Sequence, residues 1–539
     1  MFFSKKLIIL SLISGILLTI SWPVSGQSFF VFFGLIPLLF LEDFISKDKS
    51  KRKKIRLFGY AFLSFLIWNI GTSWWIINSS VFGMFFAVFC NSLFYTILIL
   101  LFNWSKKRLP LRTSYIFLIT LWISFEKLHL QWDFSWPWLN LGNVFSEDIH
   151  WIQWYEYTGV FGGSLWILII NIGFFEVFKN HYQNLKSSKL ILKLCPWLIS
   201  IAIPIAISLI IYKKELKNEA MTEVLLLQPN IDPYNEKYEM NNRYFFDLMV
   251  QMLSKQITKK TRYIITPETY FASGLGEPLN DFESSQLYHD LDSLLQLNPK
   301  TQLISGIQSF NLYRSEKEAT PTANELRKGV WVDFYNSALK MQNNSKHEFY
   351  HKSKLVVGVE NMPYKNFFKP IIGEFLLDLG GTVSSRVTQK ERTVFQHNSE
   401  GLKVGPIICY ESIYGSFVTE YVRKGANFLA IITNDAWWGN TPGHKQLLSY
   451  SRIRAIENRR SIVRSANTGI SAIINEKGEL VKNLPYGQIG VLSGKFSPAN
   501  EITFYTKYGD YIARLSNLIV ILFFLVALSG RLRKKEKLH

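Results

Sequence analysis

Eight apolar stretches constrain this sequence more than any other feature, because each is close to the length that crosses a lipid bilayer. They lie at residues 7–25, 28–43, 57–78, 81–103, 113–130, 159–178, 194–212 and 511–530. A helix needs about 17 to 25 mostly apolar residues to cross a hydrocarbon core of about 30 Å. The sequence therefore predicts a polytopic α-helical membrane domain with about eight spans.

Two of these stretches leave alternatives open. The first has Lys5 and Lys6 before its apolar run and Val24-Ser25-Gly26 after it, as a signal peptide would. We favour a retained span, because the run is long for a signal peptide and a second span follows at once. The fifth stretch contains Glu126 and Lys127, which we interpret as a buried pair or as a functional site.

Loop charge gives an independent test of the span count, because Lys and Arg gather in short cytoplasmic loops. The loop at 44–56 has seven basic residues, 104–112 and 179–193 have four each, and the tail after Gly530 has five. The alternate segments at 24–27, 79–80 and 131–158 have none. The pattern predicts cytoplasmic termini and places the long stretch after the seventh span on the outer side.

The charge balance also narrows the possible partners. Lys and Arg number 60 against 41 Asp and Glu, a net charge of +19. Nucleic acid would need these residues on one folded face, but many lie in short loops between apolar runs. We therefore expect anionic lipid headgroups and no nucleic acid. Three cysteines are too few for a disulfide framework.

Residues 213–510 have the pattern of a separate α/β domain. Short strand-like runs are predicted at 223–228, 262–266, 302–307, 330–341, 403–409, 427–434 and 461–475. Helical patterns lie between several of them, near 236–256, 283–297, 414–424 and 443–459. Unbroken apolar strands such as 429–432 indicate sheets covered on both faces.

Cys409 is the only cysteine of this outer domain, so it has no partner there for a disulfide. The surrounding VGPIICYES and the amphipathic pattern from Tyr414 predict a strand, a sharp turn and a helix. That arrangement exposes a nucleophile beside backbone N–H groups, and we expect it to lower the pKa of the thiol. Taken alone, a lone cysteine is more often a small apolar core residue.

Two further residues are candidates to assist the thiol. Glu268 directly follows the predicted strand at 262–266, where a carboxylate can project from a strand end. Lys352 lies beside an extended apolar segment, where a desolvated ammonium can stabilise an oxyanion. Individually, a turn glutamate and an exposed lysine are the more common structures.

In combination, these motifs resemble those of the nitrilase, or carbon-nitrogen hydrolase, superfamily. They are TPE at 266–268, K-x-x-L-V-x-x-x-E at 352–360, ICYES at 408–412 and NDAWWGN at 434–440. Together with the spans and with LQPNI at 227–231, FSWPWLNLGN at 134–143 and the segment 454–478, they resemble specifically the apolipoprotein N-acyltransferase family. The resemblance covers nearly the whole chain, although LVVGVE stands where many members have LVPFGE.

The resemblance implies roles for individual residues. Glu268 would be the general base, Lys352 the oxyanion-stabilising cation and Cys409 the acylated nucleophile. Glu360 would orient the lysine or share its charge. Supporting or substrate-binding positions would be Tyr410, Glu411, Trp437 and Tyr238.

The implied reaction moves an acyl chain from a phospholipid, through a cysteine thioester, to the N-terminal amino group of a diacylglyceryl apolipoprotein. No metal and no cofactor are expected. The implied architecture is a membrane domain at 1–212 with seven helices, an αββα sandwich at 213–510 and a C-terminal span with a basic tail at 511–539. The implied location is the bacterial inner membrane, with the catalytic domain on the periplasmic side, and we expect a monomer.

Two rival interpretations remain from the sequence. A membrane-anchored amidase or nitrilase would use the same three residues to hydrolyse a C–N bond. A transporter with an outer binding domain would show discontinuous helices and intramembrane charges, of which the sequence offers few. The apolar segment 362–381 is predicted to be either a lid that dips into lipid or a core hairpin or helix.

Overall fold

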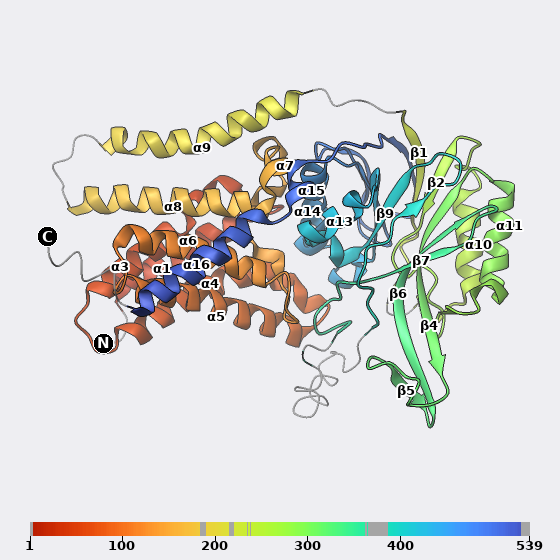
Figure 1. Cartoon of the computed structure of the whole chain (residues 1–539), viewed down its shortest axis with the longest axis horizontal. Helices are drawn as coiled ribbons and strands as arrows, with labels where there is room; N and C mark the ends of the chain where they lie inside the picture. Colours follow the sequence, from red (N-terminus) through yellow and green to blue (C-terminus); the bar gives the residue numbers. More distant parts are fainter. Residues whose placement is uncertain are drawn as a thin grey trace. The chain divides into compact units, whose positions relative to one another are not determined.

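A computed structural model describes residues 4–183, 190–214, 220–233, 236–237, 239–361, 364 and 386–529. The chain divides into two compact units. One comprises Met1–Ile77, Val81–Lys214 and Tyr508–His539, and the other Asn78–Ser80 and Glu215–Lys507. The helices of the first unit and the sheets of the second can be followed by their labels in Figure 1.

The first unit is a helical membrane domain. Within the described residues, six helical segments are long and apolar enough to cross a bilayer. They are Ser28–Lys47, Lys53–Asn78, Val81–Ser105, Val160–Tyr182, Leu190–Lys213 and Tyr511–Ser529. The principal helices in them are α3 (Ile36–Lys47), α4 (Lys53–Ser73), α5 (Val81–Ser105), α8 (Val160–Gln183), α9 (Leu190–Lys213) and α16 (Tyr511–Ser529).

The other two predicted spans are helices as well, but they are shorter. α1 (Lys5–Ile20) has 16 residues and α6 (Leu111–Leu128) has 18. The segment that begins at Ser28 is broken, because α2 (Val31–Gly34) is separated from α3. The count of eight spans and the orientation of the termini therefore stay predictions.

Lys127 and Glu126 do not form the buried pair that was one of our interpretations. Lys127 Nζ is 2.7 Å from Asp510 Oδ2. Glu126 accepts hydrogen bonds from the Ser164 hydroxyl at 2.6 Å and from the Leu141 backbone N–H at 2.7 Å. Successive residues of a helix point in different directions, so neighbours in sequence do not face each other.

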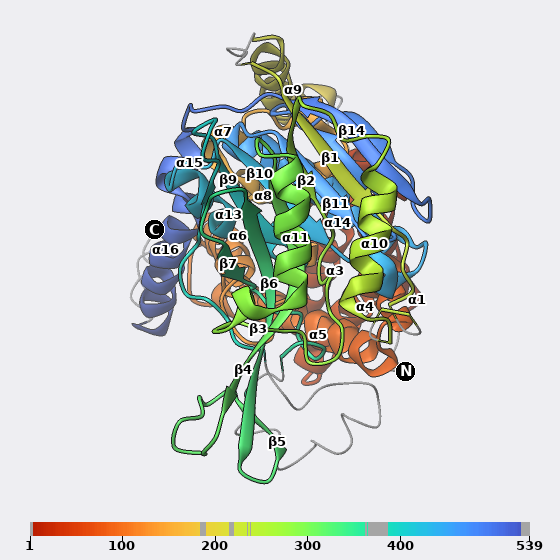
Figure 2. The ribbon, with the colours of Figure 1, turned by 90° about the vertical axis from the view of Figure 1, so that its right-hand side faces the viewer.

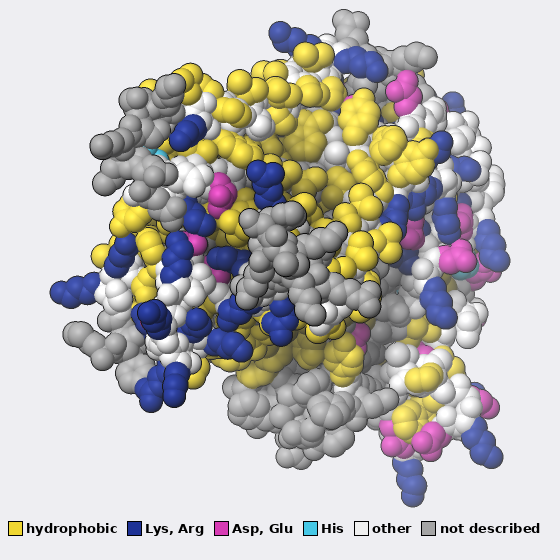
Figure 3. Space-filling view, turned by 60° about the vertical axis from the view of Figure 1, so that its left-hand side comes forward, with side chains coloured by type: hydrophobic (Ala, Val, Ile, Leu, Met, Phe, Trp, Pro, Cys, Tyr) yellow, Lys and Arg dark blue, Asp and Glu magenta, His cyan; other side chains and the backbone are white. Residues whose placement is uncertain are grey.

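Two spans of this unit leave most of their side chains outside the protein interior. Only 11% of the most apolar window of α9 and 17% of that of α16 is buried. Figure 3 shows hydrophobic side chains spread over one face of the molecule. Because soluble monomers rarely expose large continuous apolar surfaces to water, these two helices are suited to contact lipid.

The second unit contains two sheets. The first has the strand order β14-β1-β2-β4-β6-β5, with β3 paired to β4 and β7 paired to β6. Its strands are β1 (Thr222–Gln228), β2 (Thr261–Ile265), β3 (Glu277–Pro278), β4 (Gln302–Tyr313), β5 (Asn324–Arg327), β6 (Val330–Gln342), β7 (Glu348–His351) and β14 (Gly490–Phe496). β1, β2 and β4 are parallel neighbours, whereas β6 and β14 run antiparallel to theirs.

The second sheet has the order β13-β12-β11-β10-β9-β8. Its strands are β8 (Phe395–Gln396), β9 (Lys403–Ile408), β10 (Phe428–Thr433), β11 (Ile462–Ala466), β12 (Ser471–Ile474) and β13 (Leu480–Leu484). β9, β10 and β11 are parallel. The predicted strand at 461–475 is wrong as a single element, because the chain turns between β11 and β12 and these two strands pair antiparallel.

Helices cover the outer faces of both sheets, and the sheets pack on each other. α10 (Asn242–Leu253) and α11 (Gln286–Leu297) share a hydrophobic core with β1, β2 and β4 (Figure 2). α13 (Gly415–Arg423) packs on β9 and also against α14 (Pro442–Asn458). β1 packs against β11, where the Ser465 hydroxyl donates to the Leu227 carbonyl at 2.8 Å. The predicted αββα nitrilase-like domain is confirmed.

Candidate active site

Cys409 lies at the carboxyl end of β9, where the chain leaves the second sheet. The preceding residue, Ile408, pairs with Ile432 of β10, and the 3₁₀ helix η7 (Cys409–Ile413) begins at the cysteine. Cys409 has a φ of +51°. A left-handed conformation at a residue with a side chain costs about 1 to 3 kcal/mol and is characteristic of functional turns. The surrounding fold therefore holds the thiol in a strained turn.

The expectation of a lowered thiol pKa is wrong for this structure. Cys409 is only 5% exposed. Burial, followed by the negative charge of Glu268, raises the pKa of the thiol well above its usual value, although Lys352 acts in the opposite direction. A hydrogen bond with the Thr433 side chain also lowers the pKa, but it does not compensate for the loss of solvation. The resting group is therefore a neutral thiol.

Glu268 follows β2 and is nearly buried, with 6% of its surface exposed. Its Oε1 accepts hydrogen bonds from Lys352 Nζ at 2.8 Å and from Asn336 Nδ2 at 2.8 Å. Its Oε2 accepts from the Asn434 backbone N–H at 3.1 Å. These donors come from three separate segments of the unit, so the orientation of the carboxylate depends on the tertiary fold.

Lys352 follows β7 and is 1% exposed. Its Nζ is 2.8 Å from Glu268 Oε1 and 2.8 Å from Glu360 Oε2. Burial alone would lower the pKa of the ammonium, but the two carboxylates outweigh burial and raise it above its usual value. Lys352 is therefore a permanent buried cation and not a proton acceptor at neutral pH.

Glu360 completes the ion cluster. Burial opposes ionisation, yet the charges of Lys352 and Arg386 lower the pKa of this carboxyl. Its Oε2 also accepts the Val356 backbone N–H at 2.9 Å. Glu360 thus remains ionised, holds the lysine together with Glu268 and anchors the turn in LVVGVE.

Glu411 supports the site from behind the nucleophile. Its carboxylate accepts the backbone N–H groups of Ile408 at 2.8 Å and Ser353 at 2.6 Å, and the Tyr350 hydroxyl at 2.7 Å. Burial raises its pKa to about 6 despite these donors. The glutamate ties the segment that carries Lys352 to the turn that carries Cys409, so it positions both groups.

The other predicted residues lie around this centre. Tyr410 is buried and its ring packs edge-on against Tyr414, with the centroids 5.4 Å apart. Trp437 is half-buried on the short helix η8 (Asp435–Trp438). Tyr238 and nearly all of the predicted lid at 362–381 lie outside the described residues. The structure thus brings Lys352 into direct contact with Glu268 and Glu360, and the roles of all the predicted site residues stay predictions.

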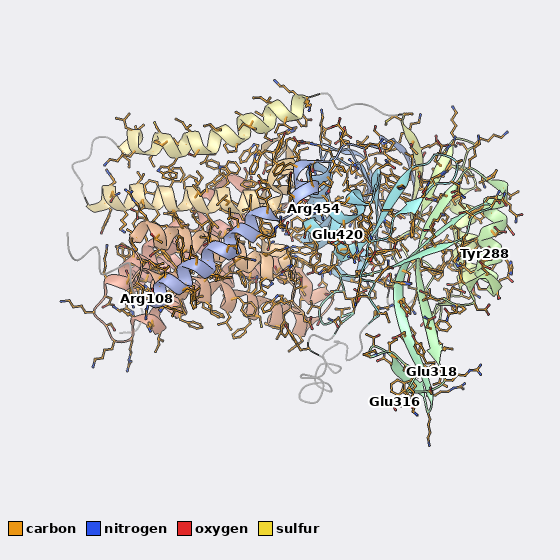
Figure 4. All side chains as sticks on the ribbon, viewed as in Figure 1. Arg108, Tyr288, Glu316, Glu318, Glu420 and Arg454 are labelled. Carbon is orange, nitrogen blue, oxygen red and sulfur yellow. The ribbon has the colours of Figure 1, made fainter. Side chains whose placement is uncertain are left out.

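Arg454 is a support that the sequence analysis did not identify. It is fully buried on α14, is labelled in Figure 4, and donates to the Ile413 carbonyl at 3.2 Å. Its partner on the same helix is Glu457, at 3.1 Å. Because Ile413 ends η7, this arginine fixes the far end of the turn that starts at Cys409.

Two more site residues were missed. Asn336 lies within β6 and donates through Nδ2 to both Glu268 and Glu360, the latter at 3.1 Å. Lys237 is 3% exposed and its Nζ donates to the Glu268 carbonyl at 3.2 Å and to the Thr269 hydroxyl. Burial lowers the pKa of Lys237 to about 8. An asparagine inside an otherwise buried strand was a usable signal for Asn336.

The described part of the chain contains no set of side chains that could bind a metal ion. Among the described residues, no group of three or more His, Cys, Asp and Glu side chains is placed to hold a metal ion. The arrangement instead offers a thiol, a carboxylate and a fixed cation. Those groups suit covalent acyl transfer with a base and an oxyanion stabiliser.

Two family models match the chain. The model described as carbon-nitrogen hydrolase matches residues 226–501, which include every site residue described above. The model described as apolipoprotein N-acyltransferase N-terminal domain matches residues 14–173. The matches divide between the catalytic unit and the helical unit.

Individual proteins resemble the chain over most of its length. An apolipoprotein N-acyltransferase from Chlorobaculum tepidum is 28% identical over 525 residues, which cover 94% of each chain. One from Rickettsia bellii is 27% identical over 517 residues, 93% of each chain. Among solved structures, an amidase from Nesterenkonia sp. is 12% identical, covers 53% of this chain and 94% of its own, and has a TM-score of 0.36.

Proposed function

Because the chain belongs to the carbon-nitrogen hydrolase family and pairs that catalytic domain with membrane helices, we propose that it is an N-acyltransferase for lipoproteins. The acyl donor is a phospholipid. The acceptor is the N-terminal amino group of an apolipoprotein whose first cysteine already carries diacylglycerol. The observation that carries the proposal is the buried Glu268–Lys352–Glu360 cluster, of which Glu268 and Lys352 act electrostatically on the thiol of the strained Cys409.

The first step forms the thioester. Glu268 takes the thiol proton as Cys409 Sγ attacks the ester carbonyl carbon, so a C–S bond forms and the carbonyl oxygen gains charge. Lys352 has three N–H donors and can turn one toward this oxyanion, together with a backbone N–H of the turn. The ester C–O bond then breaks, Glu268 returns its proton to the leaving oxygen, and the lysophospholipid departs.

The second step forms the amide. The acceptor nitrogen attacks the thioester carbon, a C–N bond forms and the C–S bond breaks. The proton lost by nitrogen passes to Glu268 and then to the departing sulfur, which restores the neutral thiol. The same base therefore serves both half-reactions, as expected for a two-step transfer through a covalent enzyme.

Membrane helices are what both substrates require. Each substrate carries acyl chains, whose transfer into water costs about 0.8 kcal/mol per CH₂. The exposed apolar faces of α9 and α16 suit a protein that remains in the bilayer with them. We further propose the bacterial inner membrane, with the catalytic unit on the periplasmic side, as the loop charges predict.

The test is the mass of the intact protein. After incubation with phospholipid vesicles alone, the protein should gain one acyl chain through a bond that hydroxylamine cleaves. Addition of a diacylglyceryl-cysteine peptide should discharge the chain onto the peptide as an amide. Cys409→Ser should show no thioester, and an adduct mapped to another residue would exclude this mechanism.

The same measurement separates the nearest rival. A membrane-anchored amidase would release free fatty acid to water, or would not react with phospholipid at all. A thioester that persists in water until the peptide arrives is the result that distinguishes acyl transfer from hydrolysis.

A further inference from the structure

A buried hydrogen-bond acceptor beside the base has no donor in the described structure. It is Oδ1 of Asn336, a residue that is 3% exposed. Leaving such a group unsatisfied costs about 1 to 3 kcal/mol, and buried polar atoms are nearly always paired. An acceptor kept open at this cost indicates a donor that arrives with a ligand.

The orientation of the Asn336 amide follows from its neighbours. Its Nδ2 donates to Glu268 Oε1 at 2.8 Å and to Glu360 Oε1 at 3.1 Å. Ionised carboxylates can only accept, so the amide nitrogen is the atom that contacts them, and the oxygen is left for a different partner. The backbone carbonyl of Asn336 is also fixed, because it accepts the Lys352 N–H at 2.8 Å.

A count of lone pairs on Glu268 gives the remaining capacity of the base. A carboxylate has about four acceptor positions. Described donors use three of them, namely Lys352 and Asn336 on Oε1 and the Asn434 N–H on Oε2. One position on Oε2 is left for the proton that the base removes. Any further N–H of a nucleophile needs a second acceptor. Asn336 can supply one through Oδ1, because its Nδ2 is hydrogen-bonded to Glu268 and Glu360.

The two proposed substrates differ in what they can offer to this acceptor. The reacting ester of a phospholipid has oxygen acceptors but no N–H or O–H donor. A primary amine keeps a second N–H when one proton is directed to the base. Of the two reacting groups, only the amine can therefore donate a hydrogen bond to Asn336 Oδ1.

We propose that Asn336 Oδ1 binds an N–H of the incoming α-amino group and aligns its nitrogen with the thioester carbon. This inference rests on the proposed N-acyltransferase function. One N–H of the neutral amine points to Glu268 and a second to Asn336, which leaves the nitrogen lone pair free for the carbon. The C–N bond then forms as the C–S bond breaks, and the proton passes through Glu268 to sulfur.

The experiment compares two nucleophiles on a preformed acyl-enzyme. Full-length protein in detergent is acylated with phospholipid, separated from donor, and mixed with the diacylglyceryl-cysteine peptide or with dithiothreitol. The thiol discharges the thioester without any N–H group. Asn336→Ala should lower the amine-to-thiol rate ratio about tenfold, the value of one hydrogen bond to a buried group. An unchanged ratio would overturn the proposal.

Glu360→Gln is the matched control. It weakens the other carboxylate that orients Asn336 Nδ2 and Lys352, but it leaves Asn336 Oδ1 in place. A role in base orientation alone slows the amine and the thiol together, so Glu360→Gln should reduce both rates and keep their ratio within about twofold. A fall in its ratio equal to that of Asn336→Ala would also overturn the proposal.

A measurement on the unaltered protein covers the case in which Asn336→Ala does not fold. An acceptor peptide with an N-methylated α-amine has one N–H fewer and should be acylated about tenfold more slowly than the primary amine. Equal rates would contradict the role of Asn336. Failure of the proposed function looks different, because the unaltered acyl-enzyme would then transfer its chain to neither peptide.

Discussion

The two units each bury a glutamate, and the two carboxylates are held in opposite ways. Glu126 in the helical unit is fully buried and accepts only neutral donors, from Ser164, Leu141 and Trp122. Glu268 in the catalytic unit accepts from the Lys352 ammonium and lies next to an amide oxygen with no described partner. Burial of an acid is common to both, and each carboxylate accepts three described hydrogen bonds, but only the donors of Glu268 include a cation.

The difference separates a structural network from a chemical one. The donors of Glu126 tie α6 to α8 and to the 3₁₀ helix η4 (Leu141–Ser146), and Ser164 also accepts the Gly142 N–H at 3.0 Å. That network is made of neutral donors around one carboxylate and stabilises one packing arrangement. The network of Glu268 contains a cation and open positions, which are the features that a reacting molecule needs.

The largest expected effect is on the rate of thioester formation, from a substitution of Glu268. Glu268→Gln keeps the size of the side chain but removes the base, so thioester formation should slow about 10³-fold, within the usual range for general-base catalysis. The measurement is the rate of the mass increase with phospholipid vesicles. A loss smaller than tenfold would mean that another group removes the thiol proton.

A change in the Glu126 network should lower the stability of the protein and leave its acylation rate unchanged. Glu126→Ala leaves buried donors of Leu141 and Ser164 without an acceptor, which should lower the free energy of unfolding by about 3 kcal/mol. The fraction that remains folded should acylate at the normal rate. Thermal unfolding in detergent and activity per folded molecule test this, and a stable but inactive variant would place Glu126 in the reaction.

Glu360→Gln should have an intermediate effect. It keeps a hydrogen-bonding group near Lys352 but removes one of the two charges that hold the ammonium. We expect thioester formation to slow about 10- to 100-fold, less than the loss of an oxyanion-stabilising group itself. Lys352→Met, which removes the cation, should cost more, and the reverse order would contradict the assignment.

The smallest expected effect is on the pH dependence of stability. Burial lowers the pKa of Lys237 to about 8 from its usual 10.5. Between these values the unfolded chain binds more protons than the folded chain, so stability rises with pH in that window. Relative to Lys237→Met, the natural protein should gain about 1 kcal/mol between pH 8 and pH 9. Chemical denaturation at the two pH values tests the sign.

Much of the catalytic fold could be predicted from the sequence because strand and helix patterns are local. β10 at Phe428–Thr433 lies within the predicted run 427–434, and α14 at Pro442–Asn458 lies close to the predicted helix at 443–459. The run 461–475 was predicted as one strand although Asn467-Thr468-Gly469 within it is a turn signal, and the chain does turn there between β11 and β12. Glu268 and Lys352 were identified because their motifs, taken together, resemble those of a known family.

The remainder depends on distances between remote segments. The pKa of the thiol was expected to fall because the sequence shows a turn followed by a helix. The sequence does not show that the packed fold buries Cys409 near a carboxylate, which raises that pKa. Asn336 was missed for the same reason. Its amide nitrogen is held by Glu268 and Glu360, which are distant in sequence, and its oxygen is left without a described donor. Burial and unfilled hydrogen bonds are properties of the packed molecule.

The pairing of β1 with β14 bears on how such a chain can be divided. Thr222 of the first strand lies opposite Phe496 of the last, so the catalytic unit begins and ends at neighbouring points of one sheet. The unit is inserted in the chain between α9 and α16, and its first and last strands are neighbours. A short linker could join those ends at little entropic cost, which makes excision or exchange of the whole enzyme core a realistic engineering operation.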